Sequence, residues 1–272
     1  MTLKETIVAA SQPLTQDAYF AESEERDVVT PENLCGLIEY PALFRAMHGN
    51  RELRPALSPA MSTGRAMNDF LTCTAAEFAE RYTVEPGPVN PKTGKPFGSD
   101  TKAYLEWAAR LTKSHVTPED HKMFGDMAQA YANHAFIKSL QGYECLPNIV
   151  LKAEIGHVTC LAKIDKLYVS DKAVLAVDVK TTEDLLAFDR TADRLSYREQ
   201  QALVALILKA NGIAQPQVFI AAIEKGAIPR CGVFGVKDLD RWEERLVALL
   251  AEYAANLKSG VFATRFEALR AL

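Results

Sequence analysis

The stretch from Ile149 to Val179 constrains the fold more than any other part of the chain. It contains short, strand-like apolar spacing that is interrupted by one polar break, Ser170-Asp171-Lys172. Such a break between two apolar runs predicts an antiparallel hairpin. If the turn centres between positions 171 and 172, residues equidistant from that centre face each other across the two strands.

This register places Asp165 opposite Asp178, with Cβ atoms about 5 Å apart. Lys180 points to the same face because it follows Asp178 by two positions. Facing carboxylates destabilise a sheet, so the pair requires compensation. A hard divalent cation provides it through carboxylate oxygens. Without metal, replacing either aspartate is therefore expected to leave the melting temperature unchanged or to raise it.

The pattern Asp-x-Lys alone is weak, because two further matches have an ordinary explanation as solvated charges. Those matches are Asp100-Thr-Lys102 at a loop edge and Asp120-His-Lys122 at a helix start. Only Asp178-Val-Lys180 lies in a buried-type strand that faces another aspartate. There a bound metal can polarise a scissile phosphate and activate water, while a lysine orients or deprotonates that water.

The segments after the hairpin predict an α/β fold with a mixed sheet. A helix is expected over 196–212, where Ser196 and Glu199 form a capping box pattern. A second hairpin is expected from Gln217–Ile223 and Ile228–Val236, followed by an amphipathic helix over 238–257. The predicted order is helices, three strands, helix, two strands and helix.

The segments before the hairpin predict a helical region with one long loop. Residues 33–48 have helical spacing that Pro41 interrupts, and 60–82 have it with a break at 72–74. Residues 85–100 contain four prolines and three glycines and predict a loop. Two more helices are expected over 104–111 and 118–140.

Composition indicates one main globular domain, with 48% apolar and 24% charged residues in 272. We expect an N-terminal arm over 1–30 and one domain over 31–272, with a helical part (31–141) and a sheet part with its helices (142–258). No segment predicts a membrane span or a targeting signal, so a cytoplasmic location is expected.

Charge and cysteines limit the kinds of site. The net charge of −4 argues weakly against a protein that coats nucleic acid, but a local basic groove remains possible. Lys92, Lys95 and Lys102 form the most basic cluster and suit contacts to DNA phosphates. Five scattered cysteines without a C-x-x-C pair indicate neither disulfides nor a zinc or iron–sulfur site. This composition disfavours nucleases that carry an iron–sulfur cluster.

Several short motifs occur together in the order of a known family. Along 33–210 the chain resembles the RecE-type (exonuclease VIII-like) phage exonucleases of the PD-(D/E)xK superfamily. The matching segments are Pro41-Ala-Leu-Phe44, Ala60-Met61 with Gly64, Glu77-Phe-x-x-x-Tyr82, Lys92-Thr-Gly-Lys95, Val116-Thr-Pro-Glu-Asp120, Ala162-Lys-Ile-Asp165, Val177-Asp-Val-Lys-Thr-Thr182 and Tyr197-x-x-Gln200.

The resemblance implies a restriction-endonuclease-like core: a central mixed sheet flanked by helices and preceded by a helical region. It implies a Mg²⁺-dependent (or Mn²⁺-dependent) exonuclease that digests one strand of linear double-stranded DNA from its 5′ end. The resulting 3′ overhangs would serve recombination with a RecT-like single-strand annealing protein. A ring-shaped homo-oligomer is implied, in the host cytoplasm if the chain is phage-encoded.

The resemblance also assigns roles to residues. Asp165 and Asp178 would be metal ligands, and Lys180 would be the base that activates water. Val179 would offer its backbone carbonyl to the metal. Gln200 and Tyr197 would support the site or contact phosphate.

One position departs from the family pattern. Members usually carry a histidine four residues after the glycine matched by Gly64, and here that position is Asn68. An amide oxygen can ligate Mg²⁺, but it is neutral. Asp69 could replace it, and Glu154 could be a further acidic ligand or form an ion pair with Lys152 or Lys163. A catalytically reduced DNA-binding or assembly relative, or an endonuclease on this fold, therefore remains an alternative.

Overall fold

The centre of the protein is a five-stranded mixed β-sheet, in a computed structural model that describes residues 2–11, 19, 22–23, 27–49 and 58–262. The strand order is β3-β4-β5-β6-β7, in which β5 and β6 are parallel and the other neighbours are antiparallel. The strands are β3 (Glu144–Ile155), β4 (Val158–Val169), β5 (Val174–Thr182), β6 (Gln217–Glu224) and β7 (Cys231–Gly235).

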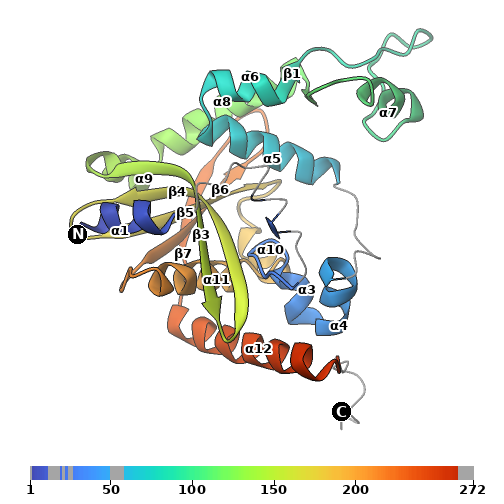
Figure 1. Cartoon of the computed structure of the whole chain (residues 1–272). Helices are drawn as coiled ribbons and strands as arrows, with labels where there is room; N and C mark the ends of the chain where they lie inside the picture. The colour runs from blue at the N-terminus through green and yellow to red at the C-terminus, as the bar shows by residue number, and fades with distance from the viewer. Residues whose placement is uncertain (1, 12–18, 20–21, 24–26, 50–57, 263–272) are drawn as a thin grey trace.

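Helices cover both faces of this sheet (Figure 1). Before the sheet come α1 (Leu3–Ala10), α3 (Leu34–Glu39), α4 (Pro41–Phe44), a π-helical turn (Arg45–Gly49), α5 (Pro59–Thr72), α6 (Ala75–Arg81), α7 (Lys102–Ala108), α8 (Pro118–Asn133), α9 (Ala135–Ser139) and a 3-10 turn (Leu140–Gly142). Within and after it come α10 (Phe188–Arg194), α11 (Tyr197–Ala210) and α12 (Leu239–Ser259). The predicted breaks at Pro41 and at 72–74 are confirmed.

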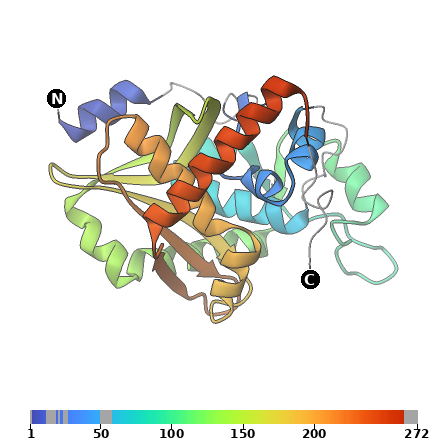
Figure 2. The same cartoon turned by 90° about the horizontal axis from the view of Figure 1, so that it is seen from below.

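On one face, α11 packs between the sheet and α12, which crosses it on the outside (Figure 2). Ala202, Leu203 and Leu208 of α11 are fully buried there. They share a core cluster with Cys160 and Ala162 of β4. Because α11 lies between β5 and β6 in the chain and these two strands are parallel neighbours, the helix is part of a crossover connection.

The opposite face is covered by α5, α8 and α9. Met67 of α5 and Phe124 of α8 are buried against Val177 and Val179 of β5. Apolar side chains of β5 thus pack on both faces, which explains why this strand reads as a nearly continuous apolar run. Asp178 interrupts this run with a charge, and Lys180 follows it two positions later.

The helix predicted over 196–212 is present as α11, but its predicted capping box does not form. Ser196 adopts the left-handed conformation with φ of 54° and its side chain makes no cap bond. The chain arrives from α10, a helix that the sequence analysis did not predict. Because only two residues join α10 to α11, Ser196 takes this left-handed conformation instead of the extended backbone that is usual at an N-cap.

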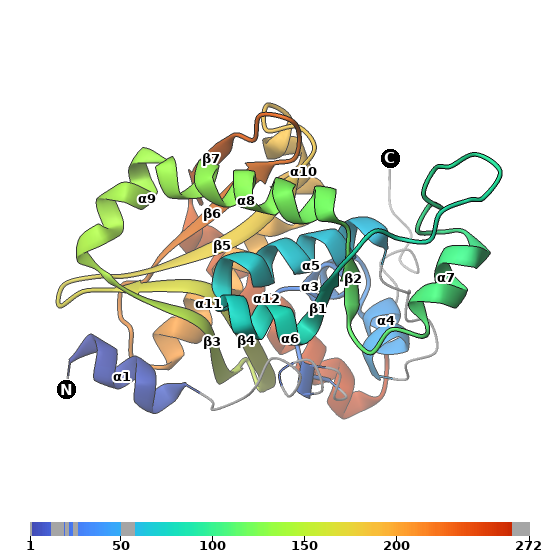
Figure 3. The ribbon, with the colours of Figure 1, turned by 90° about the horizontal axis from the view of Figure 1, so that it is seen from above.

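A small appendage projects from the helical side of the molecule (Figure 3). It begins with a two-stranded parallel ribbon of β1 (Tyr82–Val84) and β2 (Ser114–Val116). The chain between these strands forms the predicted loop over 85–100 and α7. His115 ties the ribbon to α7, because one ring nitrogen lies 2.8 Å from the Tyr104 hydroxyl and the other lies 2.7 Å from the Glu85 carbonyl oxygen.

The predicted arm, 1–30, lies partly outside the described residues. Where it is described, it packs on the core, because Ile7 of α1 and Val29 are buried. Val29 also bridges to the edge of β4 at Cys160. No helix in the described ranges combines the length and apolar character needed to cross a bilayer.

Candidate active site

The candidate site lies where the ladder between β4 and β5 ends. The predicted register is confirmed, since Lys166 pairs with Val177 and the following pairs keep the same centre. The ladder stops there, one position before Asp165 and Asp178. The Asp165 carboxylate instead accepts a hydrogen bond from the Val179 backbone N–H at 3.0 Å. A side chain therefore satisfies a backbone donor where the strands separate.

Near the start of β4, the segment that contains Val29 lies along the same edge of the strand. Val29 donates to the Thr159 carbonyl and accepts from the Leu161 N–H. Between Leu161 and Lys166, the β4 edge pairs with no strand in the part of the chain that is described. This gap exposes the side chains around Asp165 to a cavity.

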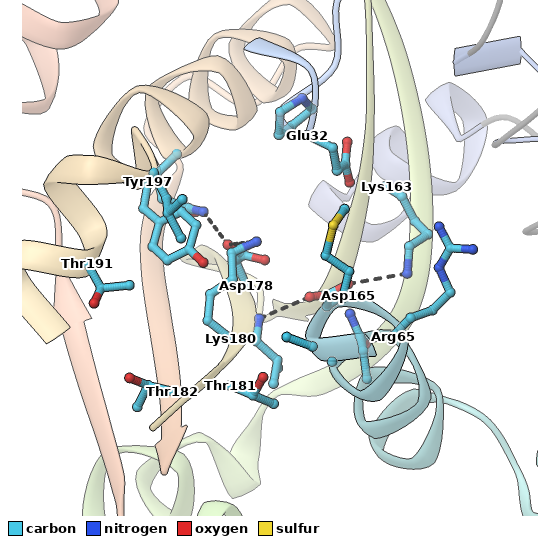
Figure 4. A pocket seen from close by; sticks show the side chains of 18 of the residues that line it. Glu32, Arg65, Lys163, Asp165, Asp178, Lys180, Thr181, Thr182, Thr191 and Tyr197 are labelled. Carbon is cyan, nitrogen blue, oxygen red and sulfur yellow. Dashed lines mark hydrogen bonds and ion pairs between the residues drawn. The ribbon is translucent and has the colours of Figure 1, made fainter. Parts of the chain in front are cut away.

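That cavity has a volume of about 630 Å³. Its floor is formed by β4 and β5, one wall by α5, and the other by α10, α11 and the loop after β5. Figure 4 shows Asp165, Asp178 and Lys180 turned into the same space. Val179, Asn68 and Tyr197 also line it. The structure thus brings together six of the residues proposed for the site from sequence.

Asp178 is held by a lysine and a glutamine. Its Oδ2 atom lies 2.9 Å from Lys180 Nζ and accepts a hydrogen bond of 2.8 Å from Gln201 Nε2. Burial raises the pKa of Asp178 to about 6, an effect opposed by Lys180 and reinforced by Asp165. The carboxyl is thus poised to titrate near neutral pH.

Lys180 is a protonated donor in this environment. Burial alone would lower its pKa, but Asp178, Tyr197 and Asp165 outweigh that effect and raise it above the ordinary value. Its ammonium group also lies 5.0 Å from the centre of the Tyr197 ring, within cation–π distance. In the metal-free protein Lys180 is therefore a hydrogen-bond donor that can orient water or a phosphate oxygen.

Asp165 is held by a second lysine, Lys163, which the sequence analysis did not identify. Lys163 Nζ lies 3.3 Å from Asp165 Oδ1 and donates to Asn148 Oδ1 at 3.1 Å. Burial raises the pKa of Asp165, but Lys163, Lys180 and the Val179 N–H reverse the effect and lower it. The spacing in the sequence could have identified Lys163, because residues two positions apart on a strand point to the same face.

The donor atoms fit a hard divalent cation. Among the described residues, no group of three or more His, Cys, Asp or Glu side chains is arranged to hold a metal. Two amide oxygens supplement the aspartates, because Asn68 Oδ1 and Gln201 Oε1 are buried without a hydrogen-bond partner. Carboxylate, amide and carbonyl oxygens are the ligands that Mg²⁺ and Mn²⁺ accept.

Gln200, which was predicted to support the site or contact phosphate, does not line the cavity. Its amide donates to the Leu195 carbonyl at 3.0 Å, and the neighbouring Gln201 reaches Asp178 instead. Adjacent residues of a helix point about 100° apart, so an error of one residue in the predicted helix phase exchanges the roles of Gln200 and Gln201. The position of Gln201 depends on how α11 starts after α10.

Glu154 also lies away from the cavity. It pairs with Thr159 at the far end of the β3–β4 hairpin, where its exposed carboxylate lies 3.7 Å from His157 Nδ1. Asn148 lies between Pro147 and Ile149, which pair with Lys166 and Ile164 on either side of Asp165. The offset from Asn148 to Glu154 corresponds to about 20 Å of strand. The predicted ion pair of Glu154 with Lys152 or Lys163 does not form either, because Lys152 pairs with Glu22 and Lys163 lies beside Asp165.

Asp69 lines the cavity but is engaged elsewhere. Its carboxylate accepts a hydrogen bond of 2.8 Å from the Tyr82 hydroxyl and lies 3.5 Å from Arg81. These partners make it a structural link between α5 and α6.

Lys92, Lys95 and Lys102 lie on the appendage and not in the cavity. All three are exposed, and Lys102 pairs with Glu106 at 3.7 Å. Figures 1 and 3 show the appendage on the side of the molecule at which α5 begins. Residues of this first half of α5 line the cavity.

Comparison with known proteins supports the fold. No protein-family model matches the chain, and no curated protein matches it. The crystal structure of a "Putative exonuclease" from Eubacterium rectale aligns with a TM-score of 0.60 and 13% sequence identity, covering 93% of this chain and 89% of the other. The crystal structure of SSO0001 aligns with a TM-score of 0.37 and 10% identity, covering 97% of this chain and 87% of the other. The chain therefore shares an α/β fold whose mixed five-stranded sheet, flanked by helices, is consistent with a restriction-endonuclease-like core.

Proposed function

We propose that this chain is a Mg²⁺-dependent nuclease that digests one strand of linear double-stranded DNA. The observation that carries the proposal is the convergence of Asp165, Asp178 and Lys180 in one cavity with the unpartnered amide oxygen of Asn68. The fold shared with a structure described as a "Putative exonuclease" agrees with it.

The residues of the cavity would have two roles, metal binding and the orientation of water or phosphate. Asp165, Asp178, the Asn68 amide and the Val179 carbonyl would hold the metal, with Gln201 close to Asp178. A bound Mg²⁺ would polarise the scissile phosphate and acidify an attacking water. Lys180 donates hydrogen bonds and would orient that water or a phosphate oxygen.

Finer features of the proposal rest on the resemblance to RecE-type exonucleases. They are 5′ to 3′ polarity, 3′ overhangs for recombination by strand annealing, a ring-shaped homo-oligomer and a RecT-like partner. Lys92, Lys95 and Lys102 are proposed to contact DNA phosphates, since exposed lysines on a projecting loop suit contacts that position a duplex.

The first test concerns the substrate. With Mg²⁺, linear duplex DNA is expected to be degraded progressively, while a covalently closed circle of the same sequence survives, because an exonuclease requires an end. Gel electrophoresis over time measures both, and EDTA should stop the reaction. Rapid cutting of the closed circle would favour an endonuclease on this fold, and inactivity on every DNA would favour the catalytically reduced alternative.

The second test concerns Asn68. A neutral amide is a weaker ligand than a charged one, so the wild type is expected to need high Mg²⁺ or to prefer Mn²⁺. Asn68→His should lower the Mn²⁺ concentration for half-maximal activity, because imidazole suits transition metals. Asn68→Ala should raise it, by roughly tenfold if the amide is a ligand.

Asn133→His on the exposed end of α8 is a matched control and should leave the metal dependence unchanged. If both Asn68 variants also leave it unchanged, Asn68 does not reach the metal. Gln201 Oε1 then becomes the candidate, because Asp69 and Glu154 are engaged elsewhere.

A further inference from the structure

Each carboxylate of the site has its own lysine. Lys163 neutralises Asp165 and Lys180 neutralises Asp178. Two carboxylates and two ammonium groups leave this centre with no net charge. Among the described residues, the remaining charged side chains that line the cavity are nearly balanced in sign: Arg65, Arg194 and Lys225 against Glu32, Asp69, Glu183 and Asp184. The charge compensation that the sequence assigned to a metal is thus already provided by the chain.

Lys163 is fixed more firmly than Lys180. Its side chain is only 7% exposed, against 22% for Lys180. Asn148, which accepts from Lys163, has a left-handed backbone with φ of 53° and donates to the Thr72 carbonyl on α5 at 3.5 Å. The ammonium group is therefore held beside Asp165 by a second strand and a helix end.

A fixed ammonium group opposes a divalent cation at the same carboxylate. A metal bound to Asp165 would have the Lys163 charge within a few ångströms, and the burial of both side chains weakens the screening of that repulsion by solvent. A DNA phosphate that enters with the metal brings the negative charge that restores the balance. The two ligands would consequently favour each other's binding.

We propose that Lys163, anchored by Asn148, makes binding of the divalent cation depend on a DNA phosphate. This inference rests on the proposed function, because it assumes that metal and DNA share the cavity. Coupling between two ligands is reciprocal, so the metal raises DNA affinity by the factor by which DNA raises metal affinity. The expected factor is roughly tenfold or more.

The test measures Mn²⁺ affinity by electron paramagnetic resonance of the free ion, without DNA and with a short blunt duplex. The end linkages of the duplex are phosphorothioates, which keep the charge and resist cleavage. The wild type should bind Mn²⁺ roughly tenfold more tightly with this duplex. A duplex with uncharged methylphosphonate end linkages should give no such gain.

Variants separate charge from structure. Lys163→Gln keeps hydrogen-bonding capacity but removes the charge, so it should bind Mn²⁺ alone about as tightly as the wild type binds it with DNA. Lys163→Arg should retain the coupling. Lys152→Gln controls for overall charge. Lys152 lies on the neighbouring strand β3, pairs with Glu22 and does not line the cavity, so this variant should bind Mn²⁺ as the wild type does under both conditions.

Asn148→Gly is a second variant in case Lys163→Gln does not fold. Glycine accepts the left-handed backbone, so this change frees the lysine without adding backbone strain and should reduce the coupling. Equal Mn²⁺ affinity of the wild type with and without charged DNA would overturn the inference and leave the nuclease proposal intact. Unchanged coupling in Lys163→Gln would also overturn it. No Mn²⁺ binding under either condition would overturn the proposed function and this inference with it.

Discussion

Replacing Asp178 with alanine is expected to reduce Mg²⁺-dependent degradation of linear DNA by about a thousandfold or more. The side chain is central to the site, because it contacts both Lys180 and Gln201 and neighbours Asp165. Its loss removes a proposed metal ligand and releases the lysine that orients water. Lys180→Ala is expected to cause a loss of similar size, while both proteins stay folded.

The measurement is the rate of nucleotide release from a labelled linear duplex at saturating Mg²⁺, with circular dichroism to verify the fold. Asp171→Ala is the matched control, since this aspartate lies in the exposed turn of the same hairpin. It should retain wild-type activity. If Asp178→Ala retained more than about a tenth of the wild-type rate, the assignment of the metal site would be wrong.

The sequence predicted the central hairpin because a single polar turn defines the register of two apolar strands. The pairing of Lys166 with Val177 matches the predicted centre. The end of the ladder could not be predicted, because the apolar pattern continues past Lys166 and Val177, where the pairing stops. Asp165 and Asp178 therefore lie just beyond the ladder and not within it.

Other features of the site depend on tertiary contacts that no local pattern encodes. Whether Gln200 or Gln201 faces the cavity depends on the left-handed Ser196 and on the short helix α10 that precedes it. The parallel ribbon of β1 and β2 joins segments separated by the long loop, so its residues show no hairpin pattern. The role of Lys163 required knowledge of Asn148 on the neighbouring strand.

From sequence, replacing either aspartate is expected to leave the metal-free melting temperature unchanged or to raise it, whereas the surroundings of the two carboxylates lead us to expect different effects. Asp178 has a pKa raised to about 6 by burial, so folding favours its protonated form. A group of this kind contributes stability below its ordinary pKa near 4, and the contribution is lost as the pH rises through about 6. Asp165 has a lowered pKa, so its contribution is present above its ordinary pKa and is lost only as the pH falls below it.

Asp178→Asn and Asp165→Asn are therefore expected to shift the metal-free melting temperature in opposite directions at pH 8. Asp178→Asn should stabilise by up to about 2 kcal/mol, because it removes a buried charge whose two hydrogen-bond donors can still find an amide oxygen. Asp165→Asn should destabilise by roughly 2–3 kcal/mol, because Lys163 stays buried without its counter-ion.

The pH dependence distinguishes these two causes from a general effect of mutation. Between pH 8 and pH 5 the gain of Asp178→Asn should disappear, since the wild-type carboxyl becomes protonated and equally neutral. The deficit of Asp165→Asn should persist over the same range, because the lowered pKa keeps the wild-type carboxylate charged. Thermal melts in EDTA at intervals of one pH unit measure both curves. If the melting temperatures of the two variants changed with pH in parallel, Lys163 would not interact preferentially with Asp165. Both aspartates would then belong to one shared charge cluster.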